Sequence, residues 1–215
     1  MATTVREKPS KYGEWWRTND LDENWYRRIF ANRSRAHEFF LDWLGGLIRQ
    51  GKRINSILEV GCGRGEPYAR LLREHGYVGV DISEKEIDFC RQRYGPDRFV
   101  VADVVAQPLQ DQYDLVFAHA VVDHVYDINR FLKNLWAMTT MDLYVSSYRG
   151  WFPRLDTHDY HWEEAYTCYN NRVSPAEARS TLEAEGASKL EIFPVYVGNS
   201  ADDIALETTI IASRR

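Results

Sequence analysis

Short apolar runs alternate with helical patterns along most of this chain of 215 residues. The runs at residues 54–60, 77–82, 98–102, 113–119 and 142–147 are typical of buried strands. Two further strands are expected at residues 190–197 and 204–212, after a helix that begins at Ser174 and Pro175. Such alternation predicts an α/β fold, a doubly wound, mostly parallel seven-stranded sheet with a terminal antiparallel strand.

Helical spacing also marks the N-terminal region and several helix starts. From residue 20 to residue 48 apolar side chains recur mainly at three- and four-residue steps, with a break near residues 31–34, which predicts one or two helices. A capping box formed by Ser83 and Glu86 and a cap at Asp127 predict the starts of two later helices. Residues 1–19 are polar, with Tyr12, Trp15 and Trp16 as possible anchors.

Composition limits the class of protein. The length fits one compact domain, and the net charge of -5 argues against bulk nucleic acid as a partner. No apolar window is long enough to span a membrane, and the N-terminus lacks the apolar stretch of a signal peptide. Three scattered cysteines predict no metal site and no disulfide framework, so we expect a reduced, cytoplasmic protein.

The most informative segment is Ile57-Leu58-Glu59-Val60-Gly61-Cys62-Gly63-Arg64-Gly65, an apolar strand that ends in a glycine loop. A second strand, which ends at Asp81, follows. This is how a nucleotide-type cofactor is held at the end of a first parallel strand. Glu66 stands where a dinucleotide motif has its third glycine, and its charge would repel a pyrophosphate. The loop therefore suits a cofactor with no phosphates and a cationic centre, which is S-adenosylmethionine.

Four segments in order carry a resemblance to a known family: ILEVGCGRG, YVGVDIS, RFVVADV and YDLVFAHAVVDHVYD. Through them, residues 54–145 resemble the core of the class I, Rossmann-like S-adenosylmethionine-dependent methyltransferases. The helical spacing upstream of the motifs predicts a cap or lid at residues 1–50, and we expect the Rossmann-like domain to span residues 51–215. Residues 148–173 are then an insertion on the side of the methyl acceptor.

The resemblance also implies a set of cofactor contacts. Asp81 would accept hydrogen bonds from the ribose hydroxyls, and Asp103 one from the adenine amino group. The implied cofactor-binding residues are Glu59, Gly61, Cys62, Gly63, Gly65, Asp81, Ile82, Asp103, Val104, His119, Arg35 and Trp16. Simpler roles stay open: loop ordering for Glu59, a loop cap for Asp103, a surface ion pair for Arg35 or its neighbour Arg33, and ordinary packing in the cap for Trp16.

Histidines are the candidate catalytic residues. His119 ends the fourth strand, where methyl transfer occurs in this fold. His158 and His161 lie in the segment that should cover the pocket, and either would serve as a base towards a hydroxyl. His161 is favoured because Trp162 would pack its loop down. Metal binding, contact with the acceptor, or a solvated loop are the alternatives, and His124 is expected to be structural.

The predicted function is transfer of a methyl group to an oxygen or nitrogen atom of a small polar acceptor, sugar-like or natural-product-like. Tyr166, Tyr169, Asn170 and Asn171 would suit such an acceptor. A cofactor-binding protein without transferase activity and a protein or nucleic-acid methyltransferase are the alternatives. Expected partners are the small-molecule acceptor alone, with no nucleic acid and no membrane, in a monomer or homodimer.

Overall fold

The computed structural model describes residues 6–19, 23–32, 34–198 and 206–214. Its strands are β1 (Ile57–Val60), β2 (Tyr77–Asp81), β3 (Phe99–Val101), β4 (Tyr113–His119), β5 (Thr139–Ser147), β6 (Trp162–Glu163), β7 (Cys168–Tyr169), β8 (Lys189–Tyr196) and β9 (Leu206–Ser213). Its α-helices are α1 (Glu14–Thr18), α2 (Glu23–Asn32), α3 (Ser34–Arg49), α4 (Tyr68–Leu71), α5 (Glu84–Tyr94), α6 (Ile128–Ala137) and α7 (Pro175–Ala184). Short 3₁₀ turns follow α4 at Arg73–His75 and α5 at Pro96–Arg98.

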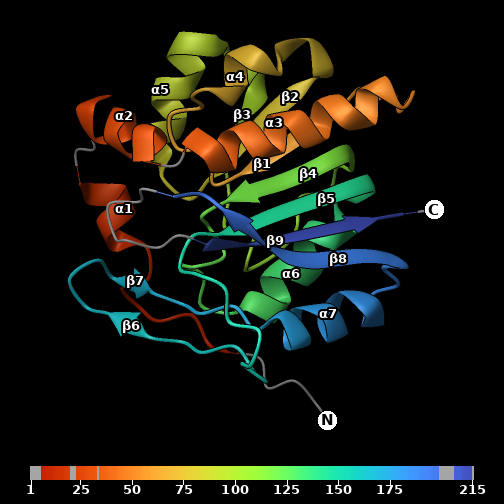
Figure 1. Ribbon diagram of the computed structural model, residues 1–215. Coiled ribbons are helices and arrows are strands. Elements are labelled where there is room, and N and C mark those ends of the chain that lie inside the picture. Colours follow the sequence, from red (N-terminus) through yellow and green to blue (C-terminus); the bar gives the residue numbers. More distant parts are fainter. Residues whose placement is uncertain (1–5, 20–22, 33, 199–205, 215) are drawn as a thin grey trace.

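The main sheet has the strand order β3-β2-β1-β4-β5-β9-β8. Strands β1 to β5 pair in parallel, and β9 runs antiparallel to both β5 and β8. Helices α3, α4 and α5 cover one face and α6 and α7 cover the other (Figure 1). This confirms the predicted doubly wound, mostly parallel sheet with an antiparallel last strand. The order reverses at β1 and β4, where open α/β sheets bind ligands.

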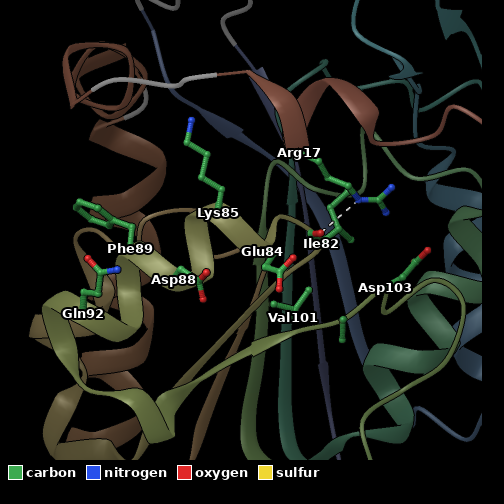
Figure 2. Close-up of a pocket in the computed structure, with 10 residues that line it drawn as sticks. Arg17, Ile82, Glu84, Lys85, Asp88, Phe89, Gln92, Val101 and Asp103 are labelled. Atoms are coloured by element: carbon green, nitrogen blue, oxygen red, sulfur yellow. Dashed lines mark hydrogen bonds between the residues drawn. The ribbon is translucent and has the colours of Figure 1, made fainter.

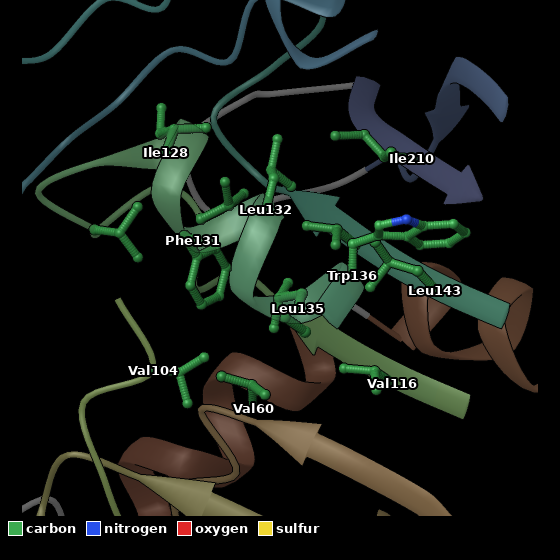
Figure 3. Packing of buried hydrophobic residues seen from close by; sticks show 14 of the residues in the cluster. Val60, Val104, Val116, Ile128, Phe131, Leu132, Leu135, Trp136, Leu143 and Ile210 are labelled. Carbon is green, nitrogen blue, oxygen red and sulfur yellow. The ribbon is translucent and has the colours of Figure 1, made fainter. Parts of the chain in front are cut away.

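Helix α6 contributes much of the core beneath β4 and β5. The side chain of Asp127 accepts a hydrogen bond from the backbone N–H of Arg130, which confirms the predicted N-cap. The buried face of α6, with Phe131, Leu135 and Trp136, packs against the apolar side chains of the central strands (Figure 3). This packing makes the sheet a rigid support for the loops at its carboxyl edge.

Two predictions of local structure were partly wrong. The Ser83 hydroxyl accepts no capping bond from the turn it precedes, and Glu86 pairs instead with the Arg64 guanidinium, 2.9 Å away. Helix α5 therefore begins as predicted but without a capping box. The sequence from Glu66 to Glu74, followed by Gly76, also predicts one helix, but the structure has the shorter α4 followed by a 3₁₀ turn.

The N-terminal segment and a hairpin cover the carboxyl edge of the sheet. The break predicted near residues 31–34 separates α2 from α3. Helix α1 and the hairpin β6–β7, which the periodicity did not reveal, lie beyond the ends of β4 and β5 (Figure 1). The backbone N–H groups of Gly13 and Trp15 donate to the carbonyl and hydroxyl of Thr167, which attaches α1 to the hairpin. Within the described residues, no helix has the length and apolar character needed to span a membrane.

Candidate cofactor and acceptor site

The glycine loop leaves β1 and turns beside the end of β2. Gly61, Gly63 and Gly65 have φ angles of 79°, 49° and 74°, a region that glycine enters without steric cost. A Cβ at Gly61 would lie 2.2 Å from Cγ2 of Val121, so the loop also lies tightly against the segment after β4. The Cys62 thiol is buried, and burial raises its pKa, which suits a small packing residue and not a nucleophile.

Asp81 connects the ends of the first two strands. One carboxylate oxygen accepts the Gly63 N–H at 3.0 Å and the other accepts the Ser83 N–H at 2.9 Å. Burial raises the pKa of Asp81, and these two N–H groups oppose that shift. The side chain is held rigidly and is half-exposed at the carboxyl edge, where it can accept further hydrogen bonds from a ligand.

Asp103 and Ile82 both line a pocket of about 890 Å³ (Figure 2). Asp103 caps the following turn, because its Oδ1 accepts the backbone N–H groups of Val105 and Ala106, while Oδ2 pairs with Lys8 at 2.7 Å. Asp103 therefore acts as a loop cap through Oδ1, and only its Oδ2 can accept additional hydrogen bonds from a ligand. Val104 is buried behind it.

The N-terminal segment covers this adenine side of the predicted site. Arg17, which lines the pocket, places Nε 3.4 Å from the carbonyl of Ile82, and a Cβ at Gly13 would lie 2.7 Å from the Ile82 side chain. The described lining of the pocket includes Ile82 and Asp103 but neither Asp81 nor the glycine loop. A bound adenosine would therefore lie under the N-terminal segment as well as beside the open pocket.

Glu59 faces the interior instead of the loop. Its carboxyl accepts a hydrogen bond from the Tyr77 hydroxyl, and burial strongly raises its pKa. This arrangement favours a structural role in joining β1 to β2. The side chain of Arg35 is exposed, with its guanidinium 5.8 Å from the ring centre of Tyr196 on β8. Its predicted contact with the cofactor therefore stays a prediction, and Arg33 lies outside the described residues.

Aromatic rings gather where α1 and α2 meet the hairpin. Trp16 is half-buried, with its ring 4.7 Å from Trp15, 6.1 Å from Trp25 and 5.5 Å from His124. The Nδ1 of His124 donates to the carbonyl of Tyr169 at 2.8 Å, which fits the structural role expected for it. These rings form an aromatic wall where α1 and α2 meet the hairpin.

The histidines proposed as bases occupy three different environments. His119 is buried and points to the α3 side of the sheet, with Nε2 3.1 Å from the Tyr68 hydroxyl and Nδ1 2.9 Å from Ser146. His161 is exposed on the hairpin, where its carbonyl accepts the Asn170 N–H. Trp162 packs edge-on against Tyr169, as expected for a residue that holds this segment in place. The catalytic role of His161 stays a prediction.

His158 joins α6 and α7. Its Nε2 lies 3.2 Å from Oδ1 of Asn129, and its Nδ1 accepts the Ser174 N–H at 3.0 Å, which together require the neutral ring. Burial lowers its pKa to about 4, although the carboxylate of Glu177 opposes the shift. With both nitrogens bonded inside the protein, His158 is better explained as a structural residue than as the base that the sequence suggested.

The neutral state of His158 predicts a pH dependence of stability. Because the folded pKa lies below the usual 6.5, the unfolded chain binds the proton more tightly between these values. The free energy of unfolding should therefore be unaffected above pH 6.5 and fall by about 2–3 kcal/mol as the pH decreases to 4. Denaturant melts of His158→Gln should lose this component, whereas the exposed His161→Gln should retain it. If the free energy of unfolding depended on pH equally in both variants, the assignment of His158 as a buried neutral histidine would be contradicted.

The sequence missed residues whose partners are distant along the chain. Asp123 is fully buried and accepts the Ser147 hydroxyl at 2.6 Å and the N–H groups of Tyr148 and Arg149, which ties the segment after β4 to the end of β5. His37 and Tyr68 were also not predicted as site residues. Only their helical periodicity was visible in the sequence, and periodicity does not show which polar groups meet.

Comparisons with known proteins agree with this geometry. The family profile described as "Methyltransferase domain" matches residues 58–141, from β1 to β5. Residues 58–141 thus form a methyltransferase domain. The methyltransferase domain thus includes the glycine loop, Asp81 and Asp103, and its family uses S-adenosylmethionine.

Named relatives of the methyltransferase domain are distant. A malonyl-acyl-carrier-protein O-methyltransferase of Ilyobacter polytropus is 25% identical over 55% of this chain and 47% of its own length. A ubiquinone biosynthesis O-methyltransferase of Bradyrhizobium diazoefficiens is 28% identical over 58% of this chain and 52% of its own. The chain thus spans about half the length of these curated relatives.

A solved structure has the same fold over most of the chain. The magnesium protoporphyrin IX methyltransferase of Synechocystis PCC 6803, crystallised with S-adenosylhomocysteine, superposes with a TM-score of 0.63 at 17% identity. The match covers 94% of each chain. The predicted Rossmann-like methyltransferase fold is therefore confirmed over nearly the whole length.

Proposed function

We propose that this protein transfers the methyl group of S-adenosylmethionine to an oxygen or nitrogen atom of a small polar acceptor. The observation that carries the proposal is the Asp81 carboxylate, fixed by the Gly63 and Ser83 N–H groups at the switch point of the sheet. A carboxylate there suits the two hydroxyls of a ribose, and three glycines with positive φ let a ligand approach the backbone beside it.

The residues present fit such a cofactor. Asp81 would hold the ribose, Ile82 and Asp103 the adenine, and the backbone of Gly61 to Gly65 the amino-acid end. The hydroxyl of Ser83 is buried without a partner among the described residues, directly beside Asp81, which leaves a polar group available to a ligand. The cofactor supplies a methyl group on a positively charged sulfur, which is already an activated leaving group.

The chain itself mainly aligns the reactants and excludes water. The wall formed by Trp15, Trp16 and Trp25 lies over the carboxyl edge, and aromatic rings favour a nearby cation. The hairpin β6–β7 and the segment held by Asp123 form the other boundary. The net charge of -5 favours a small acceptor over a nucleic acid.

Ligand-dependent melting tests the cofactor class. S-adenosylhomocysteine at a hundred times its dissociation constant should stabilise the native state by about 2.7 kcal/mol, a rise in melting temperature of roughly 5–10 °C. NAD at the same concentration should change nothing, because Glu66, bonded to the Tyr94 hydroxyl and paired with Arg93, stands where a dinucleotide-binding loop needs its third glycine. Stabilisation by NAD alone would contradict the proposal.

Transferase activity needs its own test, because a protein that only binds the cofactor would give the same melting result. Release of S-adenosylhomocysteine from S-adenosylmethionine in the presence of a panel of phenols, sugars and amines separates the two possibilities. Binding without any acceptor-dependent release would leave a cofactor-binding protein as the better description.

A further inference from the structure

Four side chains from four different elements form a continuous hydrogen-bonded chain at the carboxyl end of β4. The Nδ1 of His37 on α3 lies 2.5 Å from the Tyr68 hydroxyl on α4. The same hydroxyl lies 3.1 Å from Nε2 of His119 on β4, and Nδ1 of His119 lies 2.9 Å from the Ser146 hydroxyl on β5. The ring centres of the two histidines are 5.0 Å apart.

The hydrogen-bonded chain of these four residues is enclosed by apolar rings. Tyr68 and Ser146 are 0% and 1% exposed, whereas His37 and His119 each keep 9% of their surface accessible. The rings of Phe40 and Tyr144 pack against His119 at 5.0 Å and 5.3 Å. Placing two imidazoles and a phenol in such surroundings costs free energy unless each is bonded. The arrangement is therefore specific, and its accessible members are the histidines at the edge where ligands bind.

Neutral histidine carries one N–H, and two orderings of the protons run in a single direction through all three of these hydrogen bonds. In one, His37 donates from Nδ1 to Tyr68, Tyr68 donates to Nε2 of His119, and His119 donates from Nδ1 to Ser146. The lone pair of His37 is then on Nε2. In the other ordering every bond reverses and Nε2 of His37 carries the hydrogen. In the first ordering, a proton added to Nε2 of His37 can pass its charge along these hydrogen bonds to His119.

We propose that His37 is the base that accepts the proton of a hydroxyl acceptor, and that Tyr68, His119 and Ser146 position it and relay the charge. This rests on the proposed function and specifies its acceptor as a hydroxyl. The acceptor oxygen forms its bond to the methyl carbon as the bond from that carbon to sulfur breaks. The hydroxyl proton goes to Nε2 of His37, the Nδ1 proton of His37 goes to Tyr68, and the Tyr68 proton goes to Nε2 of His119. The products are a methyl ether, a neutral thioether and the His119 imidazolium.

An amine acceptor does not need this relay, because its neutral nitrogen attacks without losing a proton first. A hydroxyl holds its proton at neutral pH and gains from a nearby base. Within the part of the molecule that the structure describes, the phenol of Tyr144 on β5 also faces the relay, with its ring beside His119.

The first test observes the relay without any acceptor. Nitrogen-15 spectra of the histidine side chains, in the protein with bound S-adenosylhomocysteine, report the tautomer of each ring. We expect His37 and His119 to be the same tautomer, with the hydrogen on Nδ1 of both rings, so that only one of the two nitrogens bonded to Tyr68 carries a hydrogen. We also expect the two rings to titrate together. Tyr68→Phe keeps the ring but removes the hydroxyl, and should separate the two titrations. Tyr113→Phe, at the opposite end of β4, is the matched control and should leave both unchanged.

The second test uses transfer to a panel of phenols, sugars and amines, measured as S-adenosylhomocysteine released. His37→Asn should lower kcat for hydroxyl acceptors roughly 10²–10⁴-fold, and Tyr68→Phe about 10- to 100-fold, with unchanged affinity for S-adenosylhomocysteine. Tyr68→Phe should also move the acidic limb of the pH profile of kcat, which reports protonation of the base and which a merely structural residue would not move.

Several results would overturn the proposal while leaving the cofactor assignment intact. These are independent titrations of His37 and His119 in the unmodified protein, transfer confined to amines, no transfer to any hydroxyl of the panel, or hydroxyl transfer unchanged in His37→Asn. Loss of S-adenosylhomocysteine binding in the unmodified protein would instead mean that the proposed function itself is wrong.

Discussion

Replacing Asp81 with alanine is expected to weaken the binding of S-adenosylhomocysteine at least thirtyfold. The carboxylate would accept two charge-assisted hydrogen bonds from the ribose, and their loss should cost about 2–4 kcal/mol. Because each oxygen already accepts one backbone N–H, from Gly63 and from Ser83, the side chain is preorganised and loses little entropy on binding. Isothermal titration calorimetry measures the change directly.

The alanine variant also frees two backbone N–H groups, so its effect on the fold must be separated from its effect on the ligand. Asp81→Asn keeps an acceptor for one of them and should melt closer to the unmodified protein, yet still bind poorly. Asp114→Ala is the control, because this carboxylate accepts the N–H groups of Asn55 and Ser56 at the opposite end of the sheet. Unchanged affinity in Asp81→Ala, or an equal loss in Asp114→Ala, would show that the ribose site lies elsewhere.

The second large effect is expected from Gly61→Ala. The φ angle of 79° is costly for any residue with a Cβ, by about 1–2 kcal/mol, and the new methyl would lie 2.2 Å from Val121 Cγ2. Overpacking of this kind adds about 1–3 kcal/mol, so the free energy of unfolding should fall by about 2–5 kcal/mol in total. The loop would also move away from the segment after β4, with a loss of cofactor affinity.

Gly51→Ala separates the backbone cost of a positive φ angle from the steric cost of the contact with Val121. Gly51 has a φ angle of 89°, and a Cβ added there would meet nothing within 4 Å, so this variant should show the backbone cost alone. In Gly61→Ala combined with Val121→Ala, part of the steric cost should disappear. If Gly51→Ala and Gly61→Ala destabilise the protein equally, the close approach to Val121 has no energetic consequence.

Local signals in the sequence predicted the fold well because they depend on residues a few positions apart. The caps at Asp127 and Ser174 bond to N–H groups three residues ahead, so their chemistry is complete within one turn of helix. Apolar runs likewise mark buried strands wherever those strands pair. Ser83 shows the limit of such signals. Its N–H donates to Asp81, and its expected partner Glu86 pairs instead with Arg64, a residue of the glycine loop.

The sequence by itself determined the order of strands and helices, the glycine loop with Asp81, and the family, because these follow from spacing along the chain. The tertiary structure decided the surroundings of each histidine. In the sequence the three candidate histidines look alike, because each lies in or beside a segment that should form the pocket. In the structure His119 is bonded to Tyr68, His158 is buried between α6 and α7, and His161 is exposed. Their partners come from elements far away in sequence, and only packing of the sheet between its two helical layers brings them together.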